Sequence, residues 1–225
     1  EPTNAARLGE AIKIGRRGSL NGRIVVSGVQ GHVAYPHLAN NPVKGLIAVL
    51  DALYAAPLDS GSAYFSPSNF EVTSIDVGNP ATNVIPATAA AMFNIRYNDL
   101  HTPESLQAHI REIAVDTLAS SGLHADLSFE PPCQAFVTEP GQLDLALSKA
   151  VREVTGLTPT LATDGGTSDA RFIMAVCPVI EFGLTTKTIH KVDEQVAVAD
   201  LEKLTAIYRR FLDIYFETFR PHDAG

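Results

Sequence analysis

The order of regular segments within residues 18–131 constrains the fold of this 225-residue chain more than any other feature. Alternating apolar residues predict four strands, at residues 21–28, 70–77, 87–97 and 125–129. Helices are predicted to begin after Asn41 and Thr102, because both residue types are good N-caps and each is followed by a proline. The order strand, helix, strand, strand, helix, strand is the split βαβ pattern of a ferredoxin-like βαββαβ sandwich, an α+β fold. Two helices would cover one face of its sheet, which leaves the other face or an edge for a partner.

The strand predicted at residues 87–97 has the clearest alternation in the chain. Its apolar face carries Ala89, Ala91, Phe93, Ile95 and Tyr97. Arg96 then lies on the opposite face, where an arginine commonly does no more than solvate an exposed sheet surface.

Net charge and composition argue against several classes of function. The net charge of −8 argues against nucleic-acid binding, which needs a basic face, and there is no signal-peptide pattern or apolar run long enough to cross a membrane. Cys133 and Cys177 are far apart, which fits reduced thiols in a cytoplasmic protein. The chain opens at Glu1 in mid-pattern, so we expect a fragment or a processed product.

After Pro131-Pro132 the pattern changes to alternating helix and strand, typical of an α/β layer. We expect a helix closed by Gly156, a short strand near Thr160, a strand over Cys177–Phe182 and a long helix capped by Asp200. The last helix is expected to turn one face inward, with Leu201, Leu204, Ile207, Tyr208, Phe211, Ile214 and Tyr215 on it. The tail from Pro221 is expected to be disordered. Two strands are too few to bury both helices, so we expect this region to be part of a larger domain.

Two loops present donors that suit a substrate carrying a carboxylate and a reactive carbonyl. The Gly15–Gly18 turn holds two arginines between two glycines, so it is interpreted as a flexible loop whose guanidiniums bind carboxylates, or simply as a solvated turn. The loop at residues 30–37 carries His32 and Tyr35, which can donate to an oxygen that gains charge; the alternative is a polar loop with a solvent-facing histidine.

Two further loops follow in the second half of the chain. The Gly165–Asp169 turn could hold an anion on its backbone N–H groups, or serve only as a helix cap. His190 has no second histidine at metal spacing, so by itself it would be a structural imidazole.

Read together, five segments resemble the desuccinylases of the zinc aminoacylase and carboxypeptidase family. They are GRRGSLNG at 15–22, QGHVAYPH at 30–37, ATNVIP at 81–86, GGTSD at 165–169 and TIHK at 188–191. They occur in the family's order and span nearly the whole chain. The resemblance implies a lid and dimerisation domain at residues 18–131, inserted into an α/β zinc-peptidase-like catalytic domain. Residues 1–17 and 132–225 would be a remnant and the C-terminal part of that catalytic domain.

The resemblance also implies roles for individual residues. Glu1 and His190 would each be a ligand of one of two Zn²⁺ ions, and His32 would reach across a homodimer and support the oxyanion in the partner's active site. The implied substrate-binding residues are Lys13, Arg16, Ser19, Tyr35, Asn83, Arg96, Gly166 and Thr167. This chain departs from the family at Thr186, where the family usually has asparagine, and it lacks the segment that would carry the remaining metal ligands and the general base.

The implied reaction is zinc-dependent hydrolysis of N-succinyl-diaminopimelate, a small anionic substrate of the lysine and cell-wall route, with this chain an incomplete and inactive portion. Two alternatives stay open. The chain is a non-catalytic dimerisation module, or the enzyme acts on another N-acyl amino acid.

Overall fold

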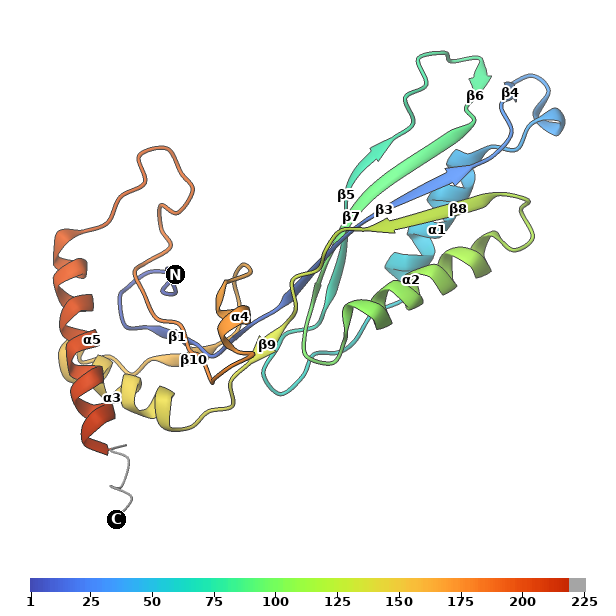
Figure 1. The fold of residues 1–225 in the computed structure, drawn as a ribbon. Helices are drawn as coiled ribbons and strands as arrows, with labels where there is room; N and C mark the ends of the chain where they lie inside the picture. The colour runs from blue at the N-terminus through green and yellow to red at the C-terminus, as the bar shows by residue number, and fades with distance from the viewer. Residues whose placement is uncertain (219–225) are drawn as a thin grey trace. The chain divides into compact units, whose positions relative to one another are not determined.

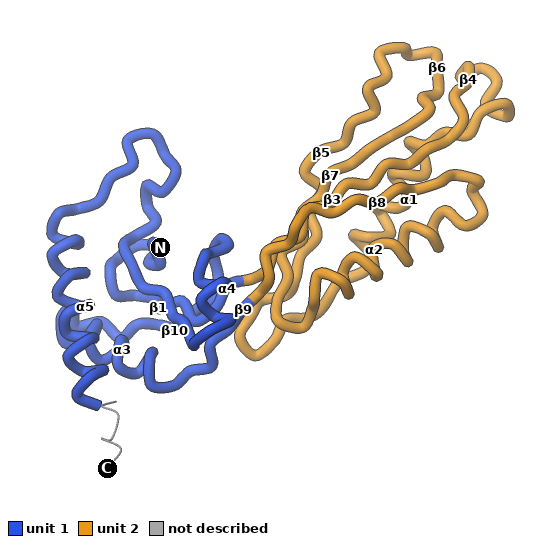
Figure 2. Tube along the Cα trace, viewed as in Figure 1, with its two compact units in different colours: residues 1–16, 136–225 blue, residues 17–135 orange. Residues whose placement is uncertain are grey.

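The structure is a computed structural model that describes residues 1–218. These residues form two compact units, one made of residues 1–16 and 136 onward and the other of residues 17–135 (Figure 2). We call them unit 1 and unit 2. The tail from Pro221 lies outside the described residues.

Unit 2 is a four-stranded antiparallel sheet in the order β5-β7-β3-β8, with two helices packed on one face (Figure 1). Its main elements are β3 (Gly18–Ser27), α1 (Pro42–Ala55), β5 (Asn69–Asp76), β7 (Thr88–Tyr97), α2 (Pro103–Leu118) and β8 (His124–Phe129). This order is that of a ferredoxin-like sandwich, which confirms the fold predicted from the sequence. A shorter pair, β4 (Gly31–His32) with β6 (Val84–Ile85), and the 3-10 helix η1 (Pro36–Leu38) lie beyond the sheet.

Local sequence explains where these elements begin and which face they bury. The Asn41 side chain accepts a hydrogen bond from the Val43 N–H at 3.0 Å, and Thr102 forms a capping box with Ser105. On β7 the predicted apolar face is buried. Gly22 on β3 lies so close beneath the Phe93 ring that a Cβ would stand 2.2 Å from it, so any larger side chain would push the ring out of the core.

Unit 1 is built from short strands and helices contributed by two separate segments. They are β1 (Ala11–Lys13), β2 (Gly15–Arg16), β9 (Phe136–Val137), α3 (Gln142–Thr155), β10 (Thr160–Ala162), α4 (Ala170–Ile173) and α5 (Val198–Thr218). Parallel pairing of β1 with β10 and antiparallel pairing of β2 with β9 join the segments. No helix among the described residues is long and apolar enough to cross a membrane.

Three expectations for this unit were wrong. Cys177–Phe182 is not a strand, because only Glu181 finds a pairing partner, in an isolated bridge with Lys13. The last helix begins at Val198 rather than behind an Asp200 cap.

The third concerns the face of α5. Ile207 and Ile214 are buried, but Leu201 and Tyr208 are 43% and 42% exposed, because the described part of the chain covers them only in part.

Candidate active-site pocket

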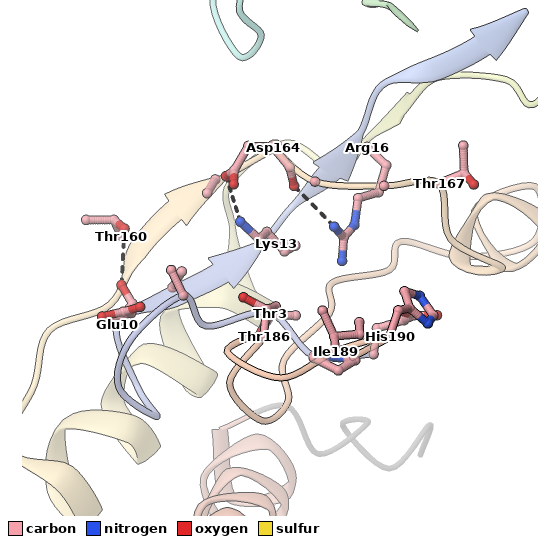
Figure 3. Close-up of a pocket in the computed structure, with 17 residues that line it drawn as sticks. Thr3, Glu10, Lys13, Arg16, Thr160, Asp164, Thr167, Thr186, Ile189 and His190 are labelled. Atoms are coloured by element: carbon pink, nitrogen blue, oxygen red, sulfur yellow. Dashed lines mark hydrogen bonds and ion pairs between the residues drawn. The ribbon is translucent and has the colours of Figure 1, made fainter. Parts of the chain in front are cut away.

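An open pocket of about 770 Å³ lies in unit 1, between β1, β2, the Gly165 loop and the segment before α5. It brings together six of the residues singled out from the sequence, namely Glu1, Lys13, Arg16, Gly166, Thr167 and His190. Figure 3 shows Lys13 and Arg16 on one side, with Thr186, Ile189 and His190 opposite them. Thr186, the position that departs from the family pattern, thus lines the same pocket.

The N-terminal wall of the pocket is organised by Asn4, which no sequence pattern marked as a site residue. Its side-chain oxygen accepts hydrogen bonds from the backbone N–H groups of Gly9, Glu10 and Ala11 at 2.9 to 3.2 Å. Its amide donates to the Gly183 carbonyl at 2.5 Å. Because Asn4 is fully buried, these bonds hold the first residues of the chain against the segment after Phe182.

The two cations of the pocket are held in different ways. Lys13 donates to Asp164 at 2.6 Å, and this hydrogen bond holds the pKa of the Asp164 carboxyl below its usual value. The Asp164 side chain is 79% exposed, so the pair can separate at little cost when another anion approaches.

Arg16 is a buried residue of β2 rather than part of a flexible loop, which corrects the interpretation of the Gly15–Gly18 turn. Its backbone pairs with Phe136, its Nε donates to Glu181 Oε2 at 2.6 Å, and its Nη1 donates to the Asp164 carbonyl at 3.1 Å. Arg17 donates to Asn69 within unit 2. Glu181 was not among the site residues predicted from the sequence, although it is a lone acid within the apolar run Val179–Phe182.

Gly165 is required next to Arg16 for two reasons. Its φ is +107°, and a Cβ there would stand 2.3 Å from Arg16 Nη1. We therefore expect Gly165→Ala to lower the free energy of unfolding by about 1–3 kcal/mol. Gly166→Ala is the matched control, because a Cβ there would meet open space, and we expect it to change stability by less than about 0.5 kcal/mol. Urea unfolding of both variants measures this, and equal stabilities would contradict the loop geometry.

The other predicted site residues lie in unit 2, in two groups. The first group consists of His32, Tyr35 and Asn83. The Asn83 carbonyl accepts a hydrogen bond from the Val33 N–H at 3.1 Å, and the ring centroids of His32 and Tyr35 are 5.8 Å apart. His32 Nδ1 accepts from the Ala34 N–H at 3.0 Å, so a neutral imidazole carries its proton on Nε2. His32 is exposed, and this Nε2–H is available to donate to an oxygen outside the unit.

The second group consists of Ser19 and Arg96, which are cross-strand partners on β3 and β7. The Ser19 hydroxyl accepts from the Asn94 side chain at 2.8 Å, which leaves its own hydrogen free to point elsewhere. Arg96 Nη1 is buried with no hydrogen-bond partner among residues 1–218. An unsatisfied buried donor is costly, so this guanidinium is suited to a bound anion.

Glu1 and His190 line the pocket, but they do not make a metal site by themselves. Among the residues that the structure describes, no three His, Cys, Asp or Glu side chains are grouped closely enough to hold a metal ion. A catalytic zinc takes about three protein ligands. The described residues therefore do not fit a complete zinc centre.

Comparisons with known proteins show which proteins this chain resembles. A model described as the peptidase dimerisation domain matches residues 14–121. A succinyl-diaminopimelate desuccinylase of Methylobacterium radiotolerans is 59% identical over 217 residues, and one of Xanthobacter autotrophicus is 55% identical over 220 residues. The alignments cover 96% and 97% of this chain. The chain therefore contains a peptidase dimerisation domain, and over nearly its whole length it is similar to succinyl-diaminopimelate desuccinylases.

The match to the desuccinylase family covers 55% and 58% of the length of these two relatives. Solved structures of more distant proteins share the fold. Aminopeptidase PepT from Bacillus cereus superposes with a TM-score of 0.77 at 19% identity, covering 95% of this chain and 56% of that one. Human carnosine dipeptidase 1 gives 0.66 at 17% identity, covering 96% and 58%.

Proposed function

We propose that the whole protein hydrolyses the amide of N-succinyl-diaminopimelate, releasing succinate and diaminopimelate in a metal-dependent reaction. The observation that carries this proposal is the 59% identity, across nearly all of this chain, to a relative named for that activity. The pocket of unit 1 supports it, because two cations on one wall suit a substrate that carries several carboxylates. The test is an assay of the purified whole protein with N-succinyl-diaminopimelate; activity only toward other N-acyl amino acids would reassign the substrate.

In this proposal the site residues divide by chemistry. Arg16 and Arg96 bind carboxylates of the substrate, and Lys13 exchanges Asp164 for a substrate oxygen. Other residues offer further hydrogen bonds to the substrate, namely Gly166 and Thr167 in unit 1 and Ser19, Tyr35 and Asn83 in unit 2. The unsatisfied Nη1 of Arg96 supports its role, because a bound carboxylate would supply the missing acceptor.

We assign His32 to catalysis in a homodimer formed through unit 2. Its Nε2–H would donate to the oxyanion that forms when the amide carbonyl is attacked in the partner's site. The hydrogen bond from Ala34 supports this role, because it keeps the donating hydrogen on Nε2. The match to a peptidase dimerisation domain supports the homodimer. The unpaired thiols Cys133 and Cys177 are consistent with a cytoplasmic location.

We assign Glu1 and His190 each to one of two Zn²⁺ ions, with the other ligands outside the described residues. For the 225-residue chain alone we therefore expect no turnover and less than one bound zinc per chain, measured by elemental analysis after dialysis. The whole protein should bind zinc and lose activity with a chelator. Two tightly bound zinc ions on this chain alone would refute the assignment.

A further inference from the structure

Glu181 is a carboxylate that the proposed chemistry does not use, yet it is buried beside the pocket. Its backbone pairs with Lys13 through two hydrogen bonds of 2.8 and 2.9 Å, which places its side chain next to β2. One carboxylate oxygen accepts from Arg16 Nε at 2.6 Å and the other accepts from the Ser168 hydroxyl. Its side chain is only 8% exposed. Both oxygens are therefore occupied by protein donors, and Glu181 is fixed.

The contacts of Arg16 fix the plane of its guanidinium. Nε is held by Glu181 and Nη1 by the Asp164 carbonyl, and the guanidinium is flat, so these two contacts set where Nη2 points. Nη2 has no hydrogen-bond partner within residues 1–218, and Figure 3 shows the guanidinium directed toward Thr186 and Ile189 across the pocket.

Ser168 extends this arrangement to the glycine loop. Its hydroxyl donates to Glu181 and accepts from the Ala170 N–H at 3.1 Å, where α4 begins. Glu181 thus joins Arg16 on β2 to the loop at residues 164–168. The guanidinium is therefore held to this loop in two ways, through the Glu181 carboxylate and directly through the Asp164 carbonyl.

We propose that Glu181 is a positioning residue, which holds the Arg16 guanidinium in the orientation that receives a substrate carboxylate. This inference rests on the proposed function, in which Arg16 binds that carboxylate. Two physical effects of Glu181 oppose each other. Its negative charge offsets the attraction of Arg16 for an anion, whereas its hydrogen bonds keep a flexible side chain ready to bind. At this site the effect of Glu181 on the orientation of Arg16 outweighs the effect of its charge.

Glu181→Gln in the whole protein separates these effects, because glutamine keeps the size but can no longer accept from both Arg16 and Ser168. We expect KM for N-succinyl-diaminopimelate to rise about 10-fold, with a much smaller change in kcat. In an Arg16→Ala background the same change should alter KM by less than about 2-fold, since there is no guanidinium left to orient. A lower KM in Glu181→Gln, or an equal KM increase in both backgrounds, overturns the proposal. Glu153→Gln is the control, since Glu153 also pairs with an arginine, Arg210, but in a partly exposed pair.

A second measurement does not depend on the activity. In the 225-residue chain, the Nε–H of Arg16 should exchange slowly with solvent, and its NMR signal is assigned by its loss in Arg16→Lys. Glu181→Gln should shift that signal and speed its exchange at least 10-fold, whereas Glu153→Gln should leave it unchanged. If the whole protein fails to hydrolyse the substrate while this result holds, the proposed function fails and the positioning of Arg16 by Glu181 stands. An unchanged Arg16 signal in Glu181→Gln sinks the inference, whatever the activity.

Discussion

Replacing Arg16 with alanine is expected to lower kcat/KM for N-succinyl-diaminopimelate by about 10- to 100-fold. A charge-assisted hydrogen bond to a carboxylate contributes about 1.5–3 kcal/mol, and Arg16 is buried, so solvent would not replace its contact with the substrate. The informative comparison is with N-acetyl-diaminopimelate, which lacks the carboxylate of the succinyl group. For that substrate we expect less than about a 3-fold loss.

Steady-state kinetics with both substrates tests this prediction. The variant also leaves the Glu181 carboxylate buried without Arg16, so its stability must be measured in parallel by thermal unfolding. Arg7→Ala is the matched control, because Arg7 lies exposed in the same unit and its loss should leave both activities within 2-fold. Equal losses for the succinyl and acetyl substrates in Arg16→Ala would argue that Arg16 does not contact the succinyl carboxylate.

The largest stability effect is expected in unit 2, from Asp59→Ala. The Asp59 side chain is 7% exposed and accepts hydrogen bonds from the Gly61 N–H at 2.7 Å and the Asn98 side chain at 2.7 Å, with His101 Nε2 at 3.0 Å. The Ser68 N–H donates to it as well. Alanine would leave these groups without their acceptor, and we expect the free energy of unfolding of unit 2 to fall by about 3 kcal/mol.

The same carboxylate gives unit 2 a pH dependence with a defined sign. Burial opposes ionisation of Asp59, but the hydrogen bonds from Ser68, Gly61 and Asn98 outweigh it and lower its pKa from 3.8 to about 2. A lowered pKa stabilises the folded state above the unfolded value, so this contribution, about 2 kcal/mol, is complete above about pH 5 and is lost between about pH 4 and pH 2.

Hydrogen exchange of the β3 and β7 amides reports the stability of unit 2 separately from unit 1. The difference between wild type and Asp59→Ala should therefore be large at pH 6 and shrink as the pH falls below 4. Asp51→Asn, a change of an exposed acid on α1, should match wild type throughout. A difference that stays constant down to pH 2 would show that the charge of Asp59 plays no part.

The sequence was sufficient for elements whose determinants are local. The alternation at residues 87–97 gave the correct buried face of β7, and Asn41 and Thr102 cap helices where they were expected to. These features depend on residues within a few positions of one another.

Features that depend on distant residues were not predictable in the same way. Arg16 was expected in a flexible turn because glycines flank it, but it pairs with Glu181, 165 positions away in the sequence. The run Cys177–Phe182 has the composition of a strand but finds a single bridge partner. The periodicity of α5 shows which residues share a face, and it carries no information on whether a neighbouring surface covers Leu201 and Tyr208.

The two-segment construction of unit 1 has a consequence for biosynthesis. Every strand and helix of unit 2 has emerged from the ribosome before Phe136, so this unit can complete its sheet while synthesis continues. The first 16 residues cannot do so, because β1 needs Thr160–Ala162 and Asn4 needs Gly183. These partners are translated more than a hundred residues later, so Leu8, Ile12 and Ile14 can join the core of unit 1 only after the whole of unit 2 has been made.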